Sequence, residues 1–210
     1  MASLKAFLKR SRGLRQAVRR IGYARRSLRH RMFGYTSDRE QELALSRFLV
    51  DPGKLSIDVG AAWGEHTEAL RRLGGPIVAI EPNPRLCEFL GDIHGDRVRV
   101  IWSAVSSEVG EVALHLAEPS GLSTIHSENP IFNATSTTIK VPCTTLDSLN
   151  LGPTGFLKID VEGHELEVLK GAAGLIARDR PSLLIEAEDR HRPGAVKSVR
   201  EFLEAMGYGV

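Results

Sequence analysis

The 210-residue chain has only two cysteines, Cys87 and Cys143, and they lie far apart in the sequence. Disulfide-stabilised folds need several cysteines at close spacings, so we expect no disulfide framework and a reducing, cytoplasmic compartment. Aromatic residues make up only 6% of the chain, which favours an aliphatic core of the kind found in parallel β-sheets. No apolar run approaches the roughly 18 residues of a membrane span, and no Cys/His cluster has zinc-site spacing.

Acidic residues are missing from residues 1–37, which contain 11 of the 28 Lys and Arg residues. The remainder has 17 basic and 26 acidic residues, a net charge of −9. Apolar residues recur in this basic segment at nearly helical spacing: Leu4, Phe7, Leu8, Leu14, Val18, Ile21 and Leu28. We therefore predict a basic amphipathic helical extension over residues 1–37, followed by one folded domain over 38–210.

The extension has three interpretations. Residues 1–35 could lie on an anionic membrane surface, which would make the protein peripheral to the membrane. A mitochondrial transit peptide has a similar composition. A solvated basic helix that packs on the domain or on a partner is the third alternative.

Beyond the extension, hydrophobic periodicity predicts alternating helices and strands. Helices are expected over residues 38–50, 65–73, 84–90, 165–172 and 195–206, and strands over 55–59, 77–80, 98–105, 112–116, 137–141, 156–161, 182–187 and 208–210. This order predicts an α/β fold with a doubly wound, Rossmann-like sheet and helices on both faces. Residues 112–116 and 137–141 alternate like a half-buried antiparallel pair. The long polar segment 118–136 is predicted to be a substrate loop or a lid. The last strand begins only at residue 208, so we expect a short or truncated C-terminal edge.

A glycine turn joins the first predicted strand to the first helix. Asp58, Gly60 and Gly64 lie in this turn, and Glu81 ends the second strand 21 residues after Gly60. Gly60 would allow a tight turn, and Gly64 would let a ligand approach the helix N-terminus. A carboxylate at the position of Glu81 accepts hydrogen bonds from ribose hydroxyls.

The glycine pattern distinguishes between two nucleoside ligands. A pyrophosphate-binding turn has the pattern G-x-G-x-x-G, which brings backbone N–H groups close to the phosphates. This chain has D-x-G-x-x-x-G, with Asp58 at the strand end. A carboxylate there would repel a pyrophosphate but suits the cationic amino-acid portion of S-adenosylmethionine. The pattern therefore favours a methyl donor over a dinucleotide, and a dinucleotide oxidoreductase is not expected.

A second acidic cluster comes after a later buried strand, in residues 156–165, which read FLKIDVEGHE. Lys158 and Asp160 share one face of the strand. Because the carboxyl ends of parallel strands line one crevice, several polar side chains should face the ligand: Asp160, Glu162, His164, Glu186 and His191.

Three roles remain open for this cluster. His164, His191 or a carboxylate could take a proton from a substrate hydroxyl as a general base. Asp160 and Glu186 could hold a divalent cation that acidifies the hydroxyl. In a structural role, Lys158 would pair with an acid and Glu165 would cap the next helix.

The chain resembles the FkbM family of methyltransferases across roughly residues 53–190. The matching pieces are Ile57-Asp58-Val59-Gly60-Ala61 with Gly64 and Thr67, Ala79-Ile80-Glu81-Pro82, Ala104-Val105-Ser106, Thr145-Leu146-Asp147, Lys158 to Glu165 with Leu169-Lys170-Gly171, and Pro181 with Leu184-Ile185-Glu186. The string K-I-D-V-E-G-x-E is the most specific of these. The resemblance implies a class I methyltransferase that uses S-adenosylmethionine and methylates a hydroxyl of a sugar, glycan or secondary metabolite.

The resemblance also implies roles for individual residues. The donor would be bound by Asp58, Gly60, Ala61, Gly64, Thr67, Glu81 and Asp160, with Ser106 near the adenine. Asp160 and Glu162 would face both donor and acceptor. Ala62 departs from the family pattern, which usually has Asn at this position. The family's sheet also normally ends in an antiparallel hairpin, for which this sequence leaves little room.

Two alternative functions remain open. The basic extension could hold the phosphates of a nucleic-acid substrate, but the net charge of −9 on the rest of the chain argues against it. A degenerate, non-catalytic donor-binding protein is the other alternative, suggested by Ala62.

Overall fold

The computed structural model describes residues 13, 16–17, 19–22, 45–117, 123–125 and 136–209. Described residues between 13 and 22 are helical, as are residues 45–49. The rest of the predicted extension, of the helix over 38–50 and of the polar segment 118–136 lies outside the described residues. The domain boundary at residue 37 therefore stays a prediction. None of the described helices is long and apolar enough to cross a membrane.

The centre of the molecule is a five-stranded parallel sheet in the order β3-β2-β1-β8-β9. Its strands are β1 (Leu55–Val59), β2 (Ile77–Glu81), β3 (Arg99–Trp102), β8 (Thr154–Ile159) and β9 (Ser182–Ile185). Every residue of β1 and β2 is buried, as expected for central parallel strands covered on both faces. The prediction of a doubly wound α/β sheet is confirmed.

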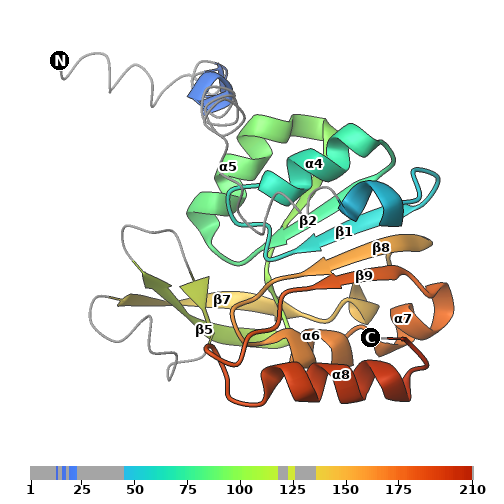
Figure 1. Ribbon diagram of the computed structural model, residues 1–210. Helices are drawn as coiled ribbons and strands as arrows, with labels where there is room; N and C mark the ends of the chain where they lie inside the picture. The colour runs from blue at the N-terminus through green and yellow to red at the C-terminus, as the bar shows by residue number, and fades with distance from the viewer. Residues whose placement is uncertain are drawn as a thin grey trace.

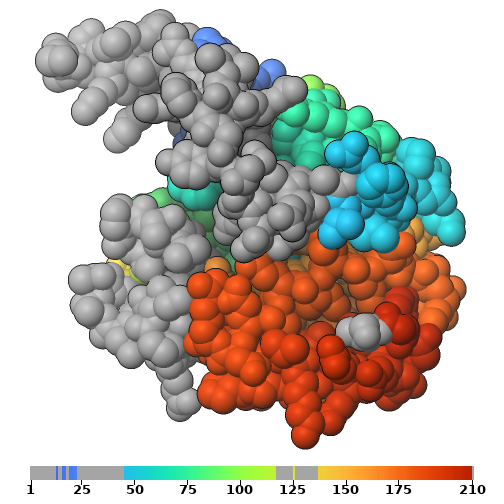
Figure 2. Space-filling model, in the orientation of Figure 1, coloured from blue at the N-terminus to red at the C-terminus, as the bar shows by residue number. Residues whose placement is uncertain are grey.

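Helices cover both faces of this sheet (Figure 1). On one side lie α4 (Glu65–Leu73) and α5 (Pro84–His94), and on the other lie α6 (Glu165–Lys170), α7 (Ala173–Asp179) and α8 (Ala195–Ala205). Each helical layer packs on its own aliphatic cluster, one centred on Leu70 and Leu90, the other on Leu157 and Ile176. The last part of the chain, orange to red, forms one continuous face in the space-filling view (Figure 2).

A second, four-stranded sheet extends from the carboxyl end of the first (Figure 1). It has the order β4-β7-β5-β6, from β4 (Ala104–Val105), β5 (Gly110–Ala117), β6 (Ser123–Thr124) and β7 (Ser136–Thr144). The pairing of β5 with β7 is antiparallel, with Val112 opposite Val141. The predicted antiparallel pair is therefore confirmed, although both strands are longer than expected.

The prediction of one strand over residues 98–105 is wrong. The chain leaves the main sheet after Trp102, and β4 then pairs with β7 in the second sheet. The break is at Ser103, whose hydroxyl donates to the carbonyls of Ala104 and Pro142. Ser103 thus fixes the point at which the chain changes sheets.

Two further predictions about the second half of the chain need correction. The sequence did not predict α7, whose first N–H groups, from Gly174 and Leu175, donate to the carboxylate of Asp147 at 2.9 and 2.7 Å. The prediction of a strand beginning at Tyr208 is wrong for residues 208 and 209, which lie in no strand. Tyr208 instead donates its hydroxyl to the Pro181 carbonyl at 3.0 Å and packs under the Arg180 guanidinium.

Candidate functional site

A cleft opens where β1, β2 and β8 end, beneath the second sheet. Its lining has three parts. The first two strands and the segments after them contribute Val59, Gly60, Ala62, Ile80, Glu81, Pro82 and Leu86. The second sheet and the chain around it contribute Ser103, Ala104, Val105, Leu114 and Ile125, and the segment after β8 contributes Asp160, Val161, Glu162 and His164. Among the predicted site residues, Gly60, Glu81, Asp160, Glu162 and His164 line this cleft, whereas Asp58, Ala61, Gly64, Thr67, Ser106, Glu186 and His191 are not part of its lining. The structure thus brings the two predicted acidic strand ends together.

Glu81 ends β2 at the cleft and is 2% exposed. Both carboxylate oxygens accept backbone hydrogen bonds at 2.8 Å, one from Ala62 N–H and the other from Asn83 N–H. The pKa of this carboxyl is raised to about 7, because burial and the charge of Asp58 outweigh the lowering effect of the two backbone hydrogen bonds and of Lys158. The carboxylate is therefore fixed in orientation and poised to gain or lose a proton near neutral pH.

The turn after β1 passes very close to the chain that continues from β8. Gly60 has a φ of +76°, and a Cβ there would lie 1.8 Å from the Asp160 carbonyl oxygen. Only glycine satisfies both the conformation and the approach. Ala62, two residues later, also has a positive φ, of 45°. Asn is one of the residues that tolerate this left-handed conformation best, so the backbone supplies a physical reason for the Asn that the family usually has there.

Gly64 is required for packing between helices. Its φ is +82°, and a Cβ would lie 2.6 Å from Leu90 Cδ2 and 3.3 Å from the His94 ring. Both of these side chains come from α5. The sequence alone suggests that Gly64 admits a ligand, but in this structure its small size lets α5 approach the start of α4.

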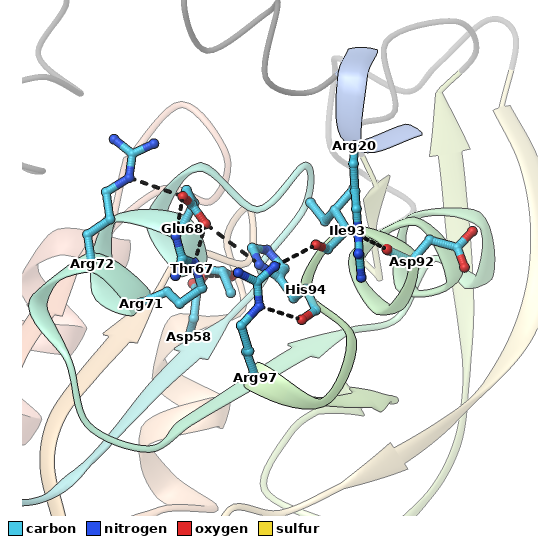
Figure 3. Close-up of polar contacts among 10 residues, drawn as sticks. All are labelled: Arg20, Asp58, Thr67, Glu68, Arg71, Arg72, Asp92, Ile93, His94 and Arg97. Carbon is cyan, nitrogen blue, oxygen red and sulfur yellow. Dashed lines mark hydrogen bonds and ion pairs between the residues drawn. The ribbon is translucent and has the colours of Figure 1, made fainter. Parts of the chain in front are cut away.

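Asp58 is completely buried below the cleft and is 0% exposed. Its Oδ2 accepts a 2.6 Å hydrogen bond from the Thr67 hydroxyl, and its Oδ1 lies 3.6 Å from Lys158 Nζ. Figure 3 shows Asp58 and Thr67 side by side at the base of α4. These contacts tie the first strand to the helix and the glycine turn between them.

Lys158 is a buried cation between the two acidic strand ends. Its Nζ lies 3.1 Å from Asp160 Oδ2 and 3.5 Å from the Gly60 carbonyl oxygen, in addition to its contact with Asp58. Burial works to lower the pKa of Lys158, but the charges of Asp160 and Asp58 outweigh it and raise the pKa above its usual value. The ammonium group therefore stays charged. The structure also contains the predicted pairing of Lys158 with an acid.

The turn after β8 places a second carboxylate, Glu162, at the cleft. Glu162 has a positive φ of 56°, and its carboxylate lies 3.0 Å from His191 Nε2. Gly163 has a φ of +104° and packs against His191. A Cβ added at Gly163 would lie 3.1 Å from the Cβ of His191. Burial raises the pKa of Glu162, and the nearby charge of Asp160 raises it further, while His191 and Arg190 lower it. His191 thus holds the turn without lining the cleft.

The remaining candidates lie around this turn. His164 lines the cleft and its Nε2 lies 2.9 Å from the Ser106 hydroxyl. Glu165 accepts the Gly163 N–H at 2.9 Å, so it closes the turn at the start of α6. Glu186 comes directly after β9 and contributes to raising the pKa of Lys158. Glu165 thus has a structural role, one of the roles left open by the sequence, but it binds the N–H of the turn before α6. The contact of Ser106 with His164 did not follow from local sequence.

A divalent cation was one open interpretation of Asp160 and Glu186. Within the described part of the chain, no group of three or more His, Cys, Asp and Glu side chains is arranged to hold a metal ion. Asp160 itself is engaged by Lys158.

The parallel sheet, the glycine turn after its first strand and the buried acid at the end of its second together define the Rossmann-like fold class of methyltransferases. The family model described as the methyltransferase FkbM domain matches residues 58–210. The chain therefore belongs to the FkbM methyltransferase family, as the resemblance predicted. No curated protein sequence matches it significantly.

A solved structure of an FkbM methyltransferase shows the same fold. The FkbM methyltransferase from Methylobacillus flagellatus superposes with a TM-score of 0.57 at 20% identity, over 76% of this chain and 39% of that protein. This chain therefore spans about two fifths of that protein's length. A precorrin-6y C5,15-methyltransferase from Geobacter metallireducens gives a TM-score of 0.47 at 18% identity, covering 83% and 73% of the two chains. An rRNA-methylase described as putative, from Clostridium thermocellum, gives 0.46 at 12% identity, covering 82% and 84%.

Proposed function

We propose that this protein transfers a methyl group from S-adenosylmethionine to a hydroxyl oxygen of a sugar, a glycan or a secondary metabolite. The observation that carries the proposal is the shared cleft of Glu81 and the Asp160–Glu162 turn. Glu81 is the acid that would bind the ribose, and Asp160 and Glu162 lie across the cleft from it. When bound, the donor supplies an electrophilic methyl group on a positively charged sulfur.

The residues on the donor side fit a nucleoside with a cationic amino-acid portion. The Glu81 carboxylate, held by two N–H groups, keeps lone pairs with which to accept the two ribose hydroxyls. Ile80, Pro82, Leu86 and Val105 supply apolar surface beside it, as a purine ring requires. Gly60 lines the cleft between Glu81 and Asp160 and packs closely against the Asp160 carbonyl. The acids along the cleft complement a sulfonium charge.

The acceptor side has to orient a hydroxyl and remove its proton. The reaction forms a C–O bond, breaks a C–S bond with a neutral sulfur leaving group, and transfers the hydroxyl proton to the protein. Asp160 is held by Lys158 and His164 contacts Ser106. Glu162 has a raised pKa and a position fixed by His191, so we propose Glu162 as the proton acceptor. Leu114 and Ile125 help to exclude water from above.

Calorimetry with S-adenosylmethionine and S-adenosylhomocysteine tests the donor side without knowledge of the acceptor. We expect micromolar binding of both by the full chain. If neither ligand bound, the proposed function would be overturned. Donor binding without methyl transfer to any acceptor would favour the non-catalytic, donor-binding alternative.

Transfer of a labelled methyl group to a panel of glycans and hydroxylated metabolites tests the reaction. We expect one class of acceptor to be labelled, and we expect the Asp160→Ala variant to lose this labelling while it still folds. Near-native labelling by that variant would contradict the role of the acidic turn. A rate that is unchanged by EDTA would exclude a required divalent cation. Labelling of RNA in place of these acceptors would revive a nucleic-acid substrate.

A further inference from the structure

Apart from the cleft, a polar groove lies where residues 16–22, in their described part, meet the α4–α5 layer. We call this the arm groove. It consists of two adjoining hollows that share Arg20, His94 and Arg97, and it also includes Gln16, Glu68, Arg71, Gly91, Ile93, Gly95, Asp96, Val98 and Val100. Figure 3 shows Arg20, Arg71 and Arg97 around His94, from the basic segment, from α4 and from the chain after α5.

The basic segment is held at this place by ionic contacts with α5. Arg19 Nη1 lies 2.7 Å from Asp92 Oδ2, and Arg19 Nη2 lies 3.6 Å from Glu88 Oε2. Arg20 donates its Nε–H to the Asp92 carbonyl at 3.1 Å. A Cβ at Gly95 would lie 3.2 Å from Arg20 Nη2, so the end of this guanidinium group reaches into the groove. Arg19 thus pairs with both acids of α5, while Arg20 adds positive charge to the groove.

The arm groove carries three guanidinium groups and two carboxylates. Arg97 donates to the His94 and Ile93 carbonyls, which caps α5 and brings its charge to the groove wall. Arg71 pairs with Glu68 at 2.7 Å, and Arg72 also binds Glu68, so this acid is more than neutralised. Asp96 is the second acid in the lining.

The neighbouring His94 responds to this positive charge. Its pKa is lowered to about 4, mainly by burial and also by the charges of Arg71 and Arg97, against the raising effect of Glu68 and Asp58. Burial accounts for most of this lowering, and Arg71 and Arg97 add to it, so the attraction for an anion rests on the guanidinium groups of Arg20, Arg71 and Arg97 that line the groove. Planar guanidinium groups from separate elements match the oxygens of a phosphate group.

The surface beside the groove favours a lipid as the source of that phosphate. Ile21, next to Arg20, is 56% exposed, and residues 1–37 combine 11 basic residues and no acid with regularly spaced apolar residues. Apolar side chains among cations suit the headgroup region of an anionic bilayer, whereas a nucleic acid would require no apolar stripe. We propose that the arm groove binds the phosphate of anionic phospholipid headgroups and holds the protein on an anionic membrane surface.

Sedimentation of the full chain with vesicles tests this proposal. We expect binding to vesicles that contain phosphatidylglycerol, weakening as salt is added, and no binding to vesicles of pure phosphatidylcholine. Arg20→Ala and Arg71→Ala should each weaken the binding about fivefold, the factor expected for removal of one basic residue near such a surface. Arg72→Ala is the matched control, because Arg72 lies on the same helix and pairs with the same Glu68 but lines neither hollow. It should change the binding less than about twofold.

Three results would overturn the proposal. They are equal binding to both kinds of vesicle, an effect of Arg72→Ala as large as that of Arg20→Ala, and binding of RNA or inorganic phosphate without binding of vesicles. Circular dichroism of each variant excludes loss of folding as the cause, and Arg20→Ala leaves the Glu68 pairs of α4 intact. Donor affinity, measured by calorimetry, should be unchanged in all three variants, so this test stands apart from that of the proposed function.

Discussion

Lys158 and Asp58 are register partners in adjacent parallel strands, and their side chains form an ion pair in which Nζ lies 3.6 Å from Oδ1. Asp160 completes the arrangement at 3.1 Å. A single ammonium group thus serves the acid below the glycine turn and the acid at the cleft. Asp58 is 0% exposed, so Lys158 is a buried partner for a buried carboxylate.

Replacement of Lys158 by Met should therefore destabilise the fold. Loss of one member of a buried ion pair leaves an uncompensated charge, which typically costs about 3–5 kcal/mol. We expect a loss of this size in the free energy of unfolding from urea titrations at neutral pH. Lys170→Met is the control: Lys170 is 46% exposed and pairs with Glu167 on the surface, so it should cost less than about 1 kcal/mol. Similar losses in both variants would contradict a special role for Lys158.

The affinity for S-adenosylmethionine should rise with pH between pH 6 and 8. The pKa of Glu81 is about 7, raised mainly by burial, so the carboxyl is mostly protonated at pH 6 and mostly ionised at pH 8. Only the ionised form offers both oxygens to the ribose hydroxyls. Proton linkage for one group then predicts an increase of about tenfold in the association constant. Calorimetry at several pH values would measure it, and Glu81→Gln should bind weakly with no such dependence. A pH-independent affinity in the unaltered protein would exclude Glu81 as the ribose ligand.

The fold should lose stability in acid because of His94. Its pKa falls from 6.5 to about 4 in the folded state, mainly through burial. Between pH 6.5 and 4, His94 therefore binds a proton in the unfolded chain but stays neutral in the folded chain. The stability that His94 contributes is complete above pH 6.5 and is lost as the pH falls towards 4, by about 2–3 kcal/mol in total. Urea titrations of the protein and of His94→Gln should show a difference that shrinks between pH 7.5 and 4.5; parallel curves would contradict the lowered pKa.

Ala62→Gly should stabilise the protein, by up to about 1 kcal/mol. Ala62 has a φ of 45°, and a left-handed conformation costs a residue with a Cβ about 1–2 kcal/mol, which is partly offset by the greater freedom of glycine in the unfolded chain. Ala62→Asn should also be tolerated. Ala61→Gly is the matched control: Ala61 is buried and has no positive φ, so this change should destabilise. Thermal unfolding of the three variants tests this prediction. A lower melting temperature for Ala62→Gly than for the unaltered protein would contradict it.

Local sequence was sufficient for the elements of the central sheet and for the residues at its carboxyl edge. Continuous apolar runs bounded by glycine and acids identified β1, β2 and β8, because a parallel strand buried on both faces needs this composition. The position of Gly60 and Glu81 at one edge then followed from the topology of parallel strands. The presence of α7 and the break at Ser103 did not follow from local sequence. The cap of α7 comes from Asp147, 27 residues before Gly174, and the break depends on the Pro142 carbonyl of another strand.

The sequence alone determined that Asp58, Gly60, Glu81 and Asp160 come at the ends of three strands. Only the tertiary structure decided what each side chain does there. It placed Asp58 beneath the cleft with Lys158, set His191 against Glu162 and packed Gly64 against Leu90 of α5. The physical reason is that strand ends follow from the local hydrophobic pattern, whereas an ion pair or a close approach depends on atoms from segments far apart in the sequence. The alternation of side chains along a strand indicates which residues share a face, but not which distant group each of them meets.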